Sequence, residues 1–238
     1  MSLSRIGVCL AAALLFGTGE ARAAWVTTAF WLFNEPVGST VADDAVGTHD
    51  GTISGGVALG SSGQNGRGTS FRFTGNGRVV IPNMGTLSPG LNWMEASIRI
   101  KTTNVPTTGD FNLFRSGEFP TSLGFKIELL TGGRASCSFK GTAGHYNNVA
   151  STFSVANNKW NLIKCVLRRV QPGVDEIILA VNNVIVARKT KPIGDVTLTL
   201  DGIVGHYSAT AGTGGYIGRA DEPQIRVCDT SCTLPRSP

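Results

Sequence analysis

Residues 93–101 read WMEASIRIK, and this stretch decides the fold class. Met94, Ala96, Ile98 and Ile100 alternate with polar or charged residues. Side chains of a β-strand point alternately to opposite faces, so the pattern predicts a strand with one face toward a core and the other toward water. No segment of the chain shows a sustained helical period, and strands are therefore the expected elements.

The same alternation recurs elsewhere. In GFKIELL, three apolar residues share one face: Phe125, Ile127 and Leu129. Lys126 and Glu128 fall on the opposite face, which we expect to be wet. The pair Asn182–Asn183 separates two further apolar runs and predicts a tight hairpin turn, since Asn tolerates a positive φ. About a dozen such short strands, with no linker or internal repeat between them, predict a single all-β sandwich.

The first residues predict an export signal. Arg5 precedes the apolar run IGVCLAAALLF, and small residues close the segment at ARA. This is the layout of a secretory signal peptide, and the run is shorter than the ~20 residues that a membrane helix needs. We expect cleavage after Ala23, a signal peptide over residues 1–23 and one domain over 24–238. The protein is predicted to be secreted, with no membrane insertion.

Four cysteines lie beyond the signal segment. An even count in an exported protein predicts disulfides, and four cysteines allow three connectivities. The CDTSC spacing favours Cys228 with Cys232, which leaves Cys137 for Cys165. Both inner cysteines lie on apolar strand faces, where two packed thiols would give the same pattern. Zinc is the other alternative, although no CxxC or HxxxH spacing supports it.

The charge of the chain is modest. The formal net charge is +5 over 238 residues. A basic excess favours nucleic acid only where it is clustered, and here the densest spots, CVLRRV and VARKTK, fall inside expected strands. We therefore predict no nucleic-acid partner.

Five segments together resemble the laminin G-like jelly roll of the concanavalin A-like lectin and glucanase superfamily. They are WLFNEPVGSTVADDAVGTHDGTI, GRGTSFRFTGNGRVVIPN, NNKWNLIKCVL, IILAVNNVIVA and GGYIGRADEPQIRV. The match covers residues 30–227. It departs from the family where Asn161 replaces a His, Asn-Asn replaces Asp-Gly in the hairpin, and Pro223 replaces a Val. The resemblance implies two antiparallel sheets packed face to face, with the N- and C-terminal strands adjacent.

The acidic loop in the first of these segments has two interpretations. Relatives on this fold hold a structural Ca²⁺ near the first and last strands, and by position the candidate ligands are Asp43, Asp44 and Asp221. Calcium prefers six to eight oxygen ligands, which Asp- and Gly-rich loops supply. The alternative is turn chemistry, because Asp bonds back to nearby backbone N–H groups. The prediction is a turn, and a bound calcium ion that stabilises this turn stays an alternative.

Catalytic motifs of this fold are missing from the sequence. Glucanases of the superfamily carry Glu-x-Asp-x-x-Glu on one strand, and alginate lyases carry Arg, Gln-x-His and Tyr. Neither set occurs here, and adjacent acidic pairs would point to opposite faces of a strand. Enzymatic activity is therefore not favoured, because sites rather than folds carry chemistry.

Two short stretches, GHYNN and GHYSA, set a tyrosine beside a histidine. If the two loops shared one rim, His145, Tyr146, His206 and Tyr207 could form a carbohydrate platform, with aromatic faces and a few polar groups. The alternative is that each tyrosine ends a strand and packs its ring. The leading prediction is a secreted, non-catalytic binding module for carbohydrate or another extracellular surface. A polysaccharide-cleaving enzyme, with carboxylates, Arg or His gathered on the concave sheet, and a protein-binding adhesion domain are the alternatives.

Overall fold

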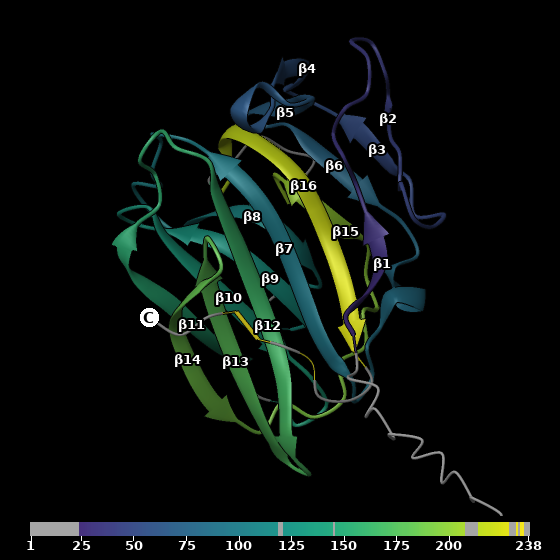
Figure 1. Cartoon of the computed structure of the whole chain (residues 1–238), viewed down its shortest axis with the longest axis vertical. Coiled ribbons are helices and arrows are strands. Elements are labelled where there is room, and N and C mark those ends of the chain that lie inside the picture. Colours follow the sequence, from purple (N-terminus) through teal and green to yellow (C-terminus); the bar gives the residue numbers. More distant parts are fainter. Residues whose placement is uncertain are drawn as a thin grey trace, which may run out of the picture.

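The computed structural model describes residues 24–118, 121–144, 146–207, 214–228, 232 and 234–235. Its strands form two antiparallel sheets of eight strands each, packed face to face as an open sandwich (Figure 1). This confirms the predicted two-sheet antiparallel fold. The predicted signal peptide, residues 1–23, lies outside the described residues. No helix in the described part is long and apolar enough to cross a membrane.

The first sheet has the order β14-β13-β12-β7-β16-β5-β4, and β1 pairs with β16. Its strands are β1 (Val26–Phe30), β4 (Val57–Ser62), β5 (Thr69–Thr74), β7 (Trp93–Lys101), β12 (Asn161–Gln171), β13 (Val174–Val181), β14 (Val184–Lys191) and β16 (Ile217–Cys228). The pairing of β1 with β16 places the first and last strands side by side, as the resemblance implied.

The second sheet has the order β11-β10-β9-β8-β15-β6-β3-β2. Its strands are β2 (Val41–Ala42), β3 (Gly51–Ser54), β6 (Arg78–Ile81), β8 (Asp110–Ser116), β9 (Gly124–Leu130), β10 (Arg134–Lys140), β11 (Tyr146–Ser154) and β15 (Gly202–Gly205). Two short 3₁₀ turns, η1 (Gln64–Gly66) and η2 (Met84–Leu87), connect strands.

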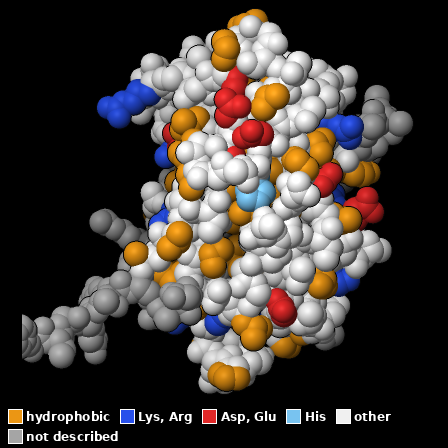
Figure 2. Space-filling model, turned by 90° about the vertical axis from the view of Figure 1, so that its right-hand side faces the viewer, with side chains coloured by type: hydrophobic (Ala, Val, Ile, Leu, Met, Phe, Trp, Pro, Cys, Tyr) orange, Lys and Arg blue, Asp and Glu red, His pale blue; other side chains and the backbone are white. Residues whose placement is uncertain are grey.

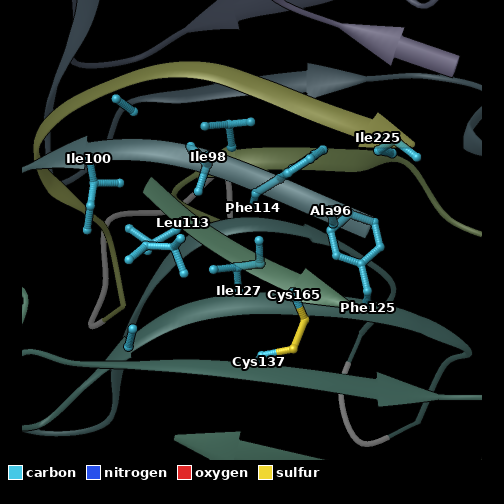
Figure 3. Close-up of a cluster of buried hydrophobic side chains, with 14 of the residues drawn as sticks. Ala96, Ile98, Ile100, Leu113, Phe114, Phe125, Ile127, Cys137, Cys165 and Ile225 are labelled. Atoms are coloured by element: carbon cyan, nitrogen blue, oxygen red, sulfur yellow. A yellow bond between two sulfur atoms is a disulfide. The ribbon is translucent and has the colours of Figure 1, made fainter. Parts of the chain in front are cut away.

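The strand that carries WMEASIRIK lies in the middle of the first sheet. Ala96 is opposite Cys165 on one neighbour and Ile225 on the other. Ile98 and Ile100 of the same face are fully buried in the core (Figure 3), and Met94 is as well, as predicted.

The other face of this strand is less exposed to solvent than the alternating pattern indicates. Glu95 is only 2% exposed, because Lys164 and Arg226 from the two flanking strands both form ion pairs with it. Alternation therefore identified the core face correctly, but cross-strand partners decided how wet the other face is.

The two disulfides join the predicted partners. Cys137 on β10 bonds Cys165 on β12, so this bridge crosses the core from one sheet to the other (Figure 3). Both residues are fully buried. Cys228 bonds Cys232 at the end of the last strand. Disulfides persist in oxidising compartments, and the pair therefore indicates such a setting for this protein.

The predicted hairpin turn is also present. Asn182 and Asn183, between β13 and β14, have φ angles of 53° and 66°. Two successive positive φ values match the right-handed twist of the flanking strands, and Asn adopts them at lower cost than most residues. This turn therefore follows from local sequence alone.

Candidate functional site

The acidic loop is built around the buried carboxylate of Asp44. One oxygen, Oδ1, accepts hydrogen bonds from the backbone N–H groups of Phe30 (2.9 Å) and Val46 (3.1 Å), and Oδ2 accepts one from His49 (3.2 Å). Burial acts to raise the pKa of Asp44, but these bonds and one from the N–H of Gly47 hold it below its ordinary value. The carboxylate thus closes its own turn and ties it to the first strand.

Neighbouring groups complete this turn. The indole Nε1 of Trp31 donates to the carbonyl oxygen of His49 at 2.8 Å, and His49 Nε2 lies 2.6 Å from the hydroxyl of Thr86. A side chain at Gly47 would meet Asp44 Oδ2 at 2.7 Å, so the turn requires glycine there. His49 therefore has partners within the loop and its surroundings that account for its position.

The predicted calcium ligands lie on two separate segments. Asp43 and Asp44 follow β2, whereas Asp221 lies in β16, where the register with β7 shifts. Glu35, which the sequence did not single out, interacts with both segments. Its Oε1 accepts the N–H of Asp43 at 2.9 Å, and its buried Oε2 has no hydrogen-bond partner among the described residues.

Figure 2 views this side of the molecule and shows acidic side chains gathered in its upper half, with basic ones at the margins. Within the described ranges, no group of three or more His, Cys, Asp or Glu side chains is arranged to hold a metal ion. Calcium at this loop stays a prediction. Asp44, whose oxygens already accept backbone N–H groups, is the least suitable of the three predicted ligands.

Among the carboxyl groups of this region, Asp221 has the pKa that departs most from its ordinary value. It is 4% exposed. Burial and the adjacent charge of Glu222 raise its pKa to about 7, against the opposing effects of the Glu222 N–H and Arg99. Glu35 also raises it, and burial raises the pKa of Glu35 in turn. The native state therefore favours a protonated Asp221 at mildly acidic pH.

We predict that Asp221 makes the protein less stable as the pH rises from about 4 to about 7. In this window the carboxyl is protonated when folded and ionised when unfolded, so the free energy of unfolding falls with pH. The full shift corresponds to about 4 kcal/mol, which screening reduces to roughly 2 kcal/mol. Asp221→Asn should flatten this profile and be the more stable protein above pH 7, as measured by urea unfolding in chelator.

In chelator, Asp43→Asn is the matched control, because its carboxylate is exposed. Parallel profiles for wild type and Asp221→Asn would contradict the prediction. Repeating the series with Ca²⁺ tests the calcium prediction as well. An ion bound through Asp221 should raise the stability of wild type above pH 7 and leave Asp221→Asn unchanged.

A second group of polar residues lies on the outer face of the second sheet, which is turned away from the core. We call these residues the polar stripe. They are Asp110, Asn112 and Arg115 on β8, Lys126 and Glu128 on β9, Ser136 and Ser138 on β10, and Tyr146 on β11. All but Asp110 and Tyr146 are more than nine-tenths buried. Buried polar groups cost free energy unless they are paired, so such a face needs partners.

Lys126 provides these partners at the centre of the stripe. Its Nζ lies 3.0 Å from Asp110 Oδ2 and also contacts Glu128 Oε2. Burial acts to lower the pKa of Lys126, but the two carboxylates raise it overall. For Glu128, burial raises the pKa, and the positive charge of Lys126 acts to lower it. Lys126 offsets one of the two carboxylate charges, so the three groups together carry a net charge of −1.

Beside this cluster the surface is hollowed. A hollow of about 190 Å³ is lined by Arg115, Gly117, Glu118, Leu200, Asp201, Ile203 and Tyr207. Arg115 is 6% exposed, and its Nε donates to the carbonyl oxygen of Gly117 at 2.7 Å. Burial lowers its pKa. The guanidinium lies 5.5 Å from the centre of the Tyr207 ring, which is 46% exposed.

The predicted ligand-binding residues are only partly brought together. Tyr146 lies on β11, and Tyr207 follows the end of β15 in the same sheet. Because β10, β9 and β8 separate these two strands, the strands are about 19 Å apart at ordinary strand spacing. The hydroxyl of Tyr146 lies 3.0 Å from that of Ser138. His206 is buried and stacks on Tyr207, with ring centres 5.6 Å apart. His145 lies outside the described residues.

Sequence reasoning missed Arg115, Asp110 and the role of Lys126 and Glu128. Alternation placed Lys126 and Glu128 on the face opposite the core, which is correct. It predicted a wet face, whereas neighbouring strands bury both residues almost completely. A Lys and a Glu two residues apart in a strand was the available signal, since such side chains share a face.

Comparisons with known proteins show likeness of fold. No known protein-family model matches the chain, and no curated protein matches by sequence. Domain 4 of AbnA, a GH43 extracellular arabinanase from Geobacillus stearothermophilus solved with arabinotriose, has a TM-score of 0.61 and 18% identity, covering 89% of this chain and 95% of that domain. The binding domain of Paraclostridial Mosquitocidal Protein 1 has a TM-score of 0.61 and 14% identity.

The botulinum neurotoxin serotype D ligand-binding domain, solved in complex with N-acetylneuraminic acid, has a TM-score of 0.60 and 14% identity. The matches cover 88% of this chain and 50% of the mosquitocidal domain, and 87% and 48% for the neurotoxin domain. This chain thus spans about half the length of the toxin domains. The class that the fold defines is a two-sheet β-sandwich shared with binding domains.

Proposed function

We propose that the protein is a secreted, non-catalytic module that binds carbohydrate, on a laminin G-like jelly roll. The observation that supports it best is the hollow beside Tyr207, which combines a half-exposed aromatic ring with a buried Arg115 and the adjoining polar stripe. Carbohydrate sites use an apolar ring face with a few fixed polar groups, and the buried side chains of Arg115 and His206 both pack against this ring.

Two further observations support this reading. The structural neighbours include domains solved with a bound oligosaccharide or sugar acid. The two disulfides fit an exported protein, which would meet polysaccharides outside the cell. Because the polar stripe is neutralised internally, its charges are fixed in place before any ligand arrives, and such pre-organisation lowers the cost of binding.

The test is a glycan-array scan of residues 24–238, with and without chelator, followed by titration of the best ligand. Tyr207→Ala should weaken binding at least about tenfold, because a central aromatic contact contributes on the order of 2 kcal/mol. Tyr146→Ala should weaken it less, since its strand lies three strand spacings from β8 and four from β15, the two strands that line the hollow. Phe153→Ala is the matched control: it is 46% exposed and lines a different hollow, with residues of β13 and β14.

Unchanged affinity in Tyr207→Ala, with the fold intact, would contradict the proposed site. The absence of binding to any glycan would remove the carbohydrate proposal and favour a protein partner. Loss of binding in chelator would point instead to the acidic loop and its predicted calcium.

A second candidate function is cleavage of a polysaccharide. It is favoured by one observation: two carboxylates, Asp110 and Glu128, face the same side of the second sheet, and burial raises the pKa of Glu128. Glycosidases pair a protonated acid with an ionised partner in this way. Lys126 contacts both and offsets one of their two negative charges, which favours binding over catalysis.

Release of new reducing ends or unsaturated products from the array's best ligand would support cleavage. In that case Glu128→Gln should abolish product release while leaving ligand affinity within about threefold, because the amide keeps the shape but cannot transfer a proton. A wild-type protein that binds a polysaccharide and leaves its chain length unchanged would exclude this second function for that ligand.

A further inference from the structure

We infer that the hollow beside Tyr207 selects its sugar by charge: it binds a protonated amino sugar and rejects acidic sugars. This rests on the proposed carbohydrate-binding function and names the ligand class. The inference starts from two carboxylates at the rim of the hollow, Glu118 and Asp201. Both residues are exposed, and neither forms an ion pair within 4 Å with another residue that the structure describes. The charge of Glu118 still acts on the Arg115 guanidinium, so the two carboxylates and this one cation leave a single negative charge at the hollow.

The backbone holds these two carboxylates on adjacent segments. Glu118 follows β8, and its carbonyl oxygen accepts the N–H of Ser122 at 2.7 Å, which fixes the start of its loop. Asp201 precedes β15, whose Gly202 pairs with Ser116 of β8. The Ser116 hydroxyl also donates to the Leu200 carbonyl oxygen at 2.9 Å. The rim is therefore positioned by two neighbouring strands.

The cation that lines the hollow is not placed to serve an acidic ligand. Arg115 is buried beneath the tyrosine ring, and it donates through both Nε and Nη2 to the carbonyl oxygen of Gly117. Its Nη1 lies 3.4 Å from Asn112 Oδ1. Lys126, the next cation along the stripe, already contacts two carboxylates.

An incoming sugar therefore meets negative charge first. A carboxylate on the ligand would be repelled by Glu118 and Asp201. Arg115, the one cation among the described residues that line the hollow, already donates to Gly117 and lies beside Asn112. An ammonium group would be attracted by both and could also lie against the face of Tyr207, where the ring quadrupole favours a cation. The local charge opposes the +5 of the whole chain, which by itself would favour acidic partners.

The test compares three oligosaccharide series of equal length: glucosamine oligomers, N-acetylglucosamine oligomers and uronic acid oligomers. Titration calorimetry at pH 6 and low salt should rank them in that order of decreasing affinity. The double variant Glu118→Gln/Asp201→Asn should weaken binding of the amino oligomer about tenfold, because exposed charge pairs contribute up to about fivefold each. Added salt should reduce the preference, since surface charges are screened.

Asp43→Asn is the control, because it removes an exposed carboxylate that lines a different hollow. Equal affinity for the amino and N-acetylated oligomers, or preference for the uronic acid series, would overturn the inference while leaving the carbohydrate proposal intact. Amino-oligomer binding that Tyr207→Ala weakens but the double variant does not would also overturn it. No binding to any series, together with no binding on the array, would instead remove the proposed function itself.

Discussion

Replacing both Cys137 and Cys165 by alanine is expected to lower the free energy of unfolding by about 3–4 kcal/mol. The disulfide closes a loop with a sequence separation of 28, and loop-closure entropy assigns about 3.6 kcal/mol to a cross-link of that length. The bridge joins the two sheets within the core, so its removal also leaves two small side chains where sulfur atoms pack. Urea unfolding of wild type and variant measures the difference.

The second disulfide provides the comparison. Cys228 and Cys232 are four residues apart, and the same relation gives about 2 kcal/mol for Cys228→Ala/Cys232→Ala. An equal or larger loss from this local pair would contradict the argument that loop length decides the effect. Thiol titration of unreduced, denatured wild type should find no free thiol among these four residues.

Asp44→Ala is expected to lower the free energy of unfolding by about 3 kcal/mol or more. The substitution leaves the backbone N–H groups of Phe30, Val46 and His49 without their acceptor in a largely buried place. Hydrogen bonds to a charged group contribute about 1.5–3 kcal/mol each, and an unsatisfied buried donor adds its own desolvation cost. The first strand and the acidic turn should therefore loosen together.

Thermal and urea unfolding of three variants separates this role from a general charge effect. Asp43→Ala, one residue earlier and exposed, should change stability by no more than about 0.5 kcal/mol. Asp44→Asn keeps one acceptor oxygen and should lie between the two. Because the folded pKa of Asp44 is lowered, its contribution is present above its ordinary pKa of 3.8 and is lost as the pH falls. A loss in Asp43→Ala equal to that in Asp44→Ala would contradict the turn interpretation.

The acidic loop and the hollow beside Tyr207 use their carboxylates in different ways. The loop uses its best-placed carboxylate to bond its own backbone, which stabilises the fold. The rim of the hollow leaves Glu118 and Asp201 exposed, with no ion-pair partner among the described residues. A carboxylate that does not hold the backbone in place is the better candidate for contact with a ligand.

The sequence by itself determined the fold class and the core faces, and it favoured the disulfide pairing that the structure shows. Each depends on information that lies close together along the chain. Strand alternation repeats every two residues, the Asn182–Asn183 turn is set by two positive φ values, and the CDTSC spacing limits Cys228 to a near partner. The pair Cys137–Cys165 was the remaining combination, and the structure shows that these two buried cysteines are bonded rather than packed as free thiols.

Only the tertiary structure decided the site. Tyr146 and Tyr207 occur in similar stretches, yet the sheet order puts three strands between them. Arg115 and Asp201 lie 86 positions apart in the sequence and line the same hollow because β8 pairs with β15. Sheet order comes from which apolar faces pack best across the whole sandwich, a property that no local period contains. Burial of Lys126 and Glu128 has the same origin, since cross-strand neighbours rather than their own strand remove them from water.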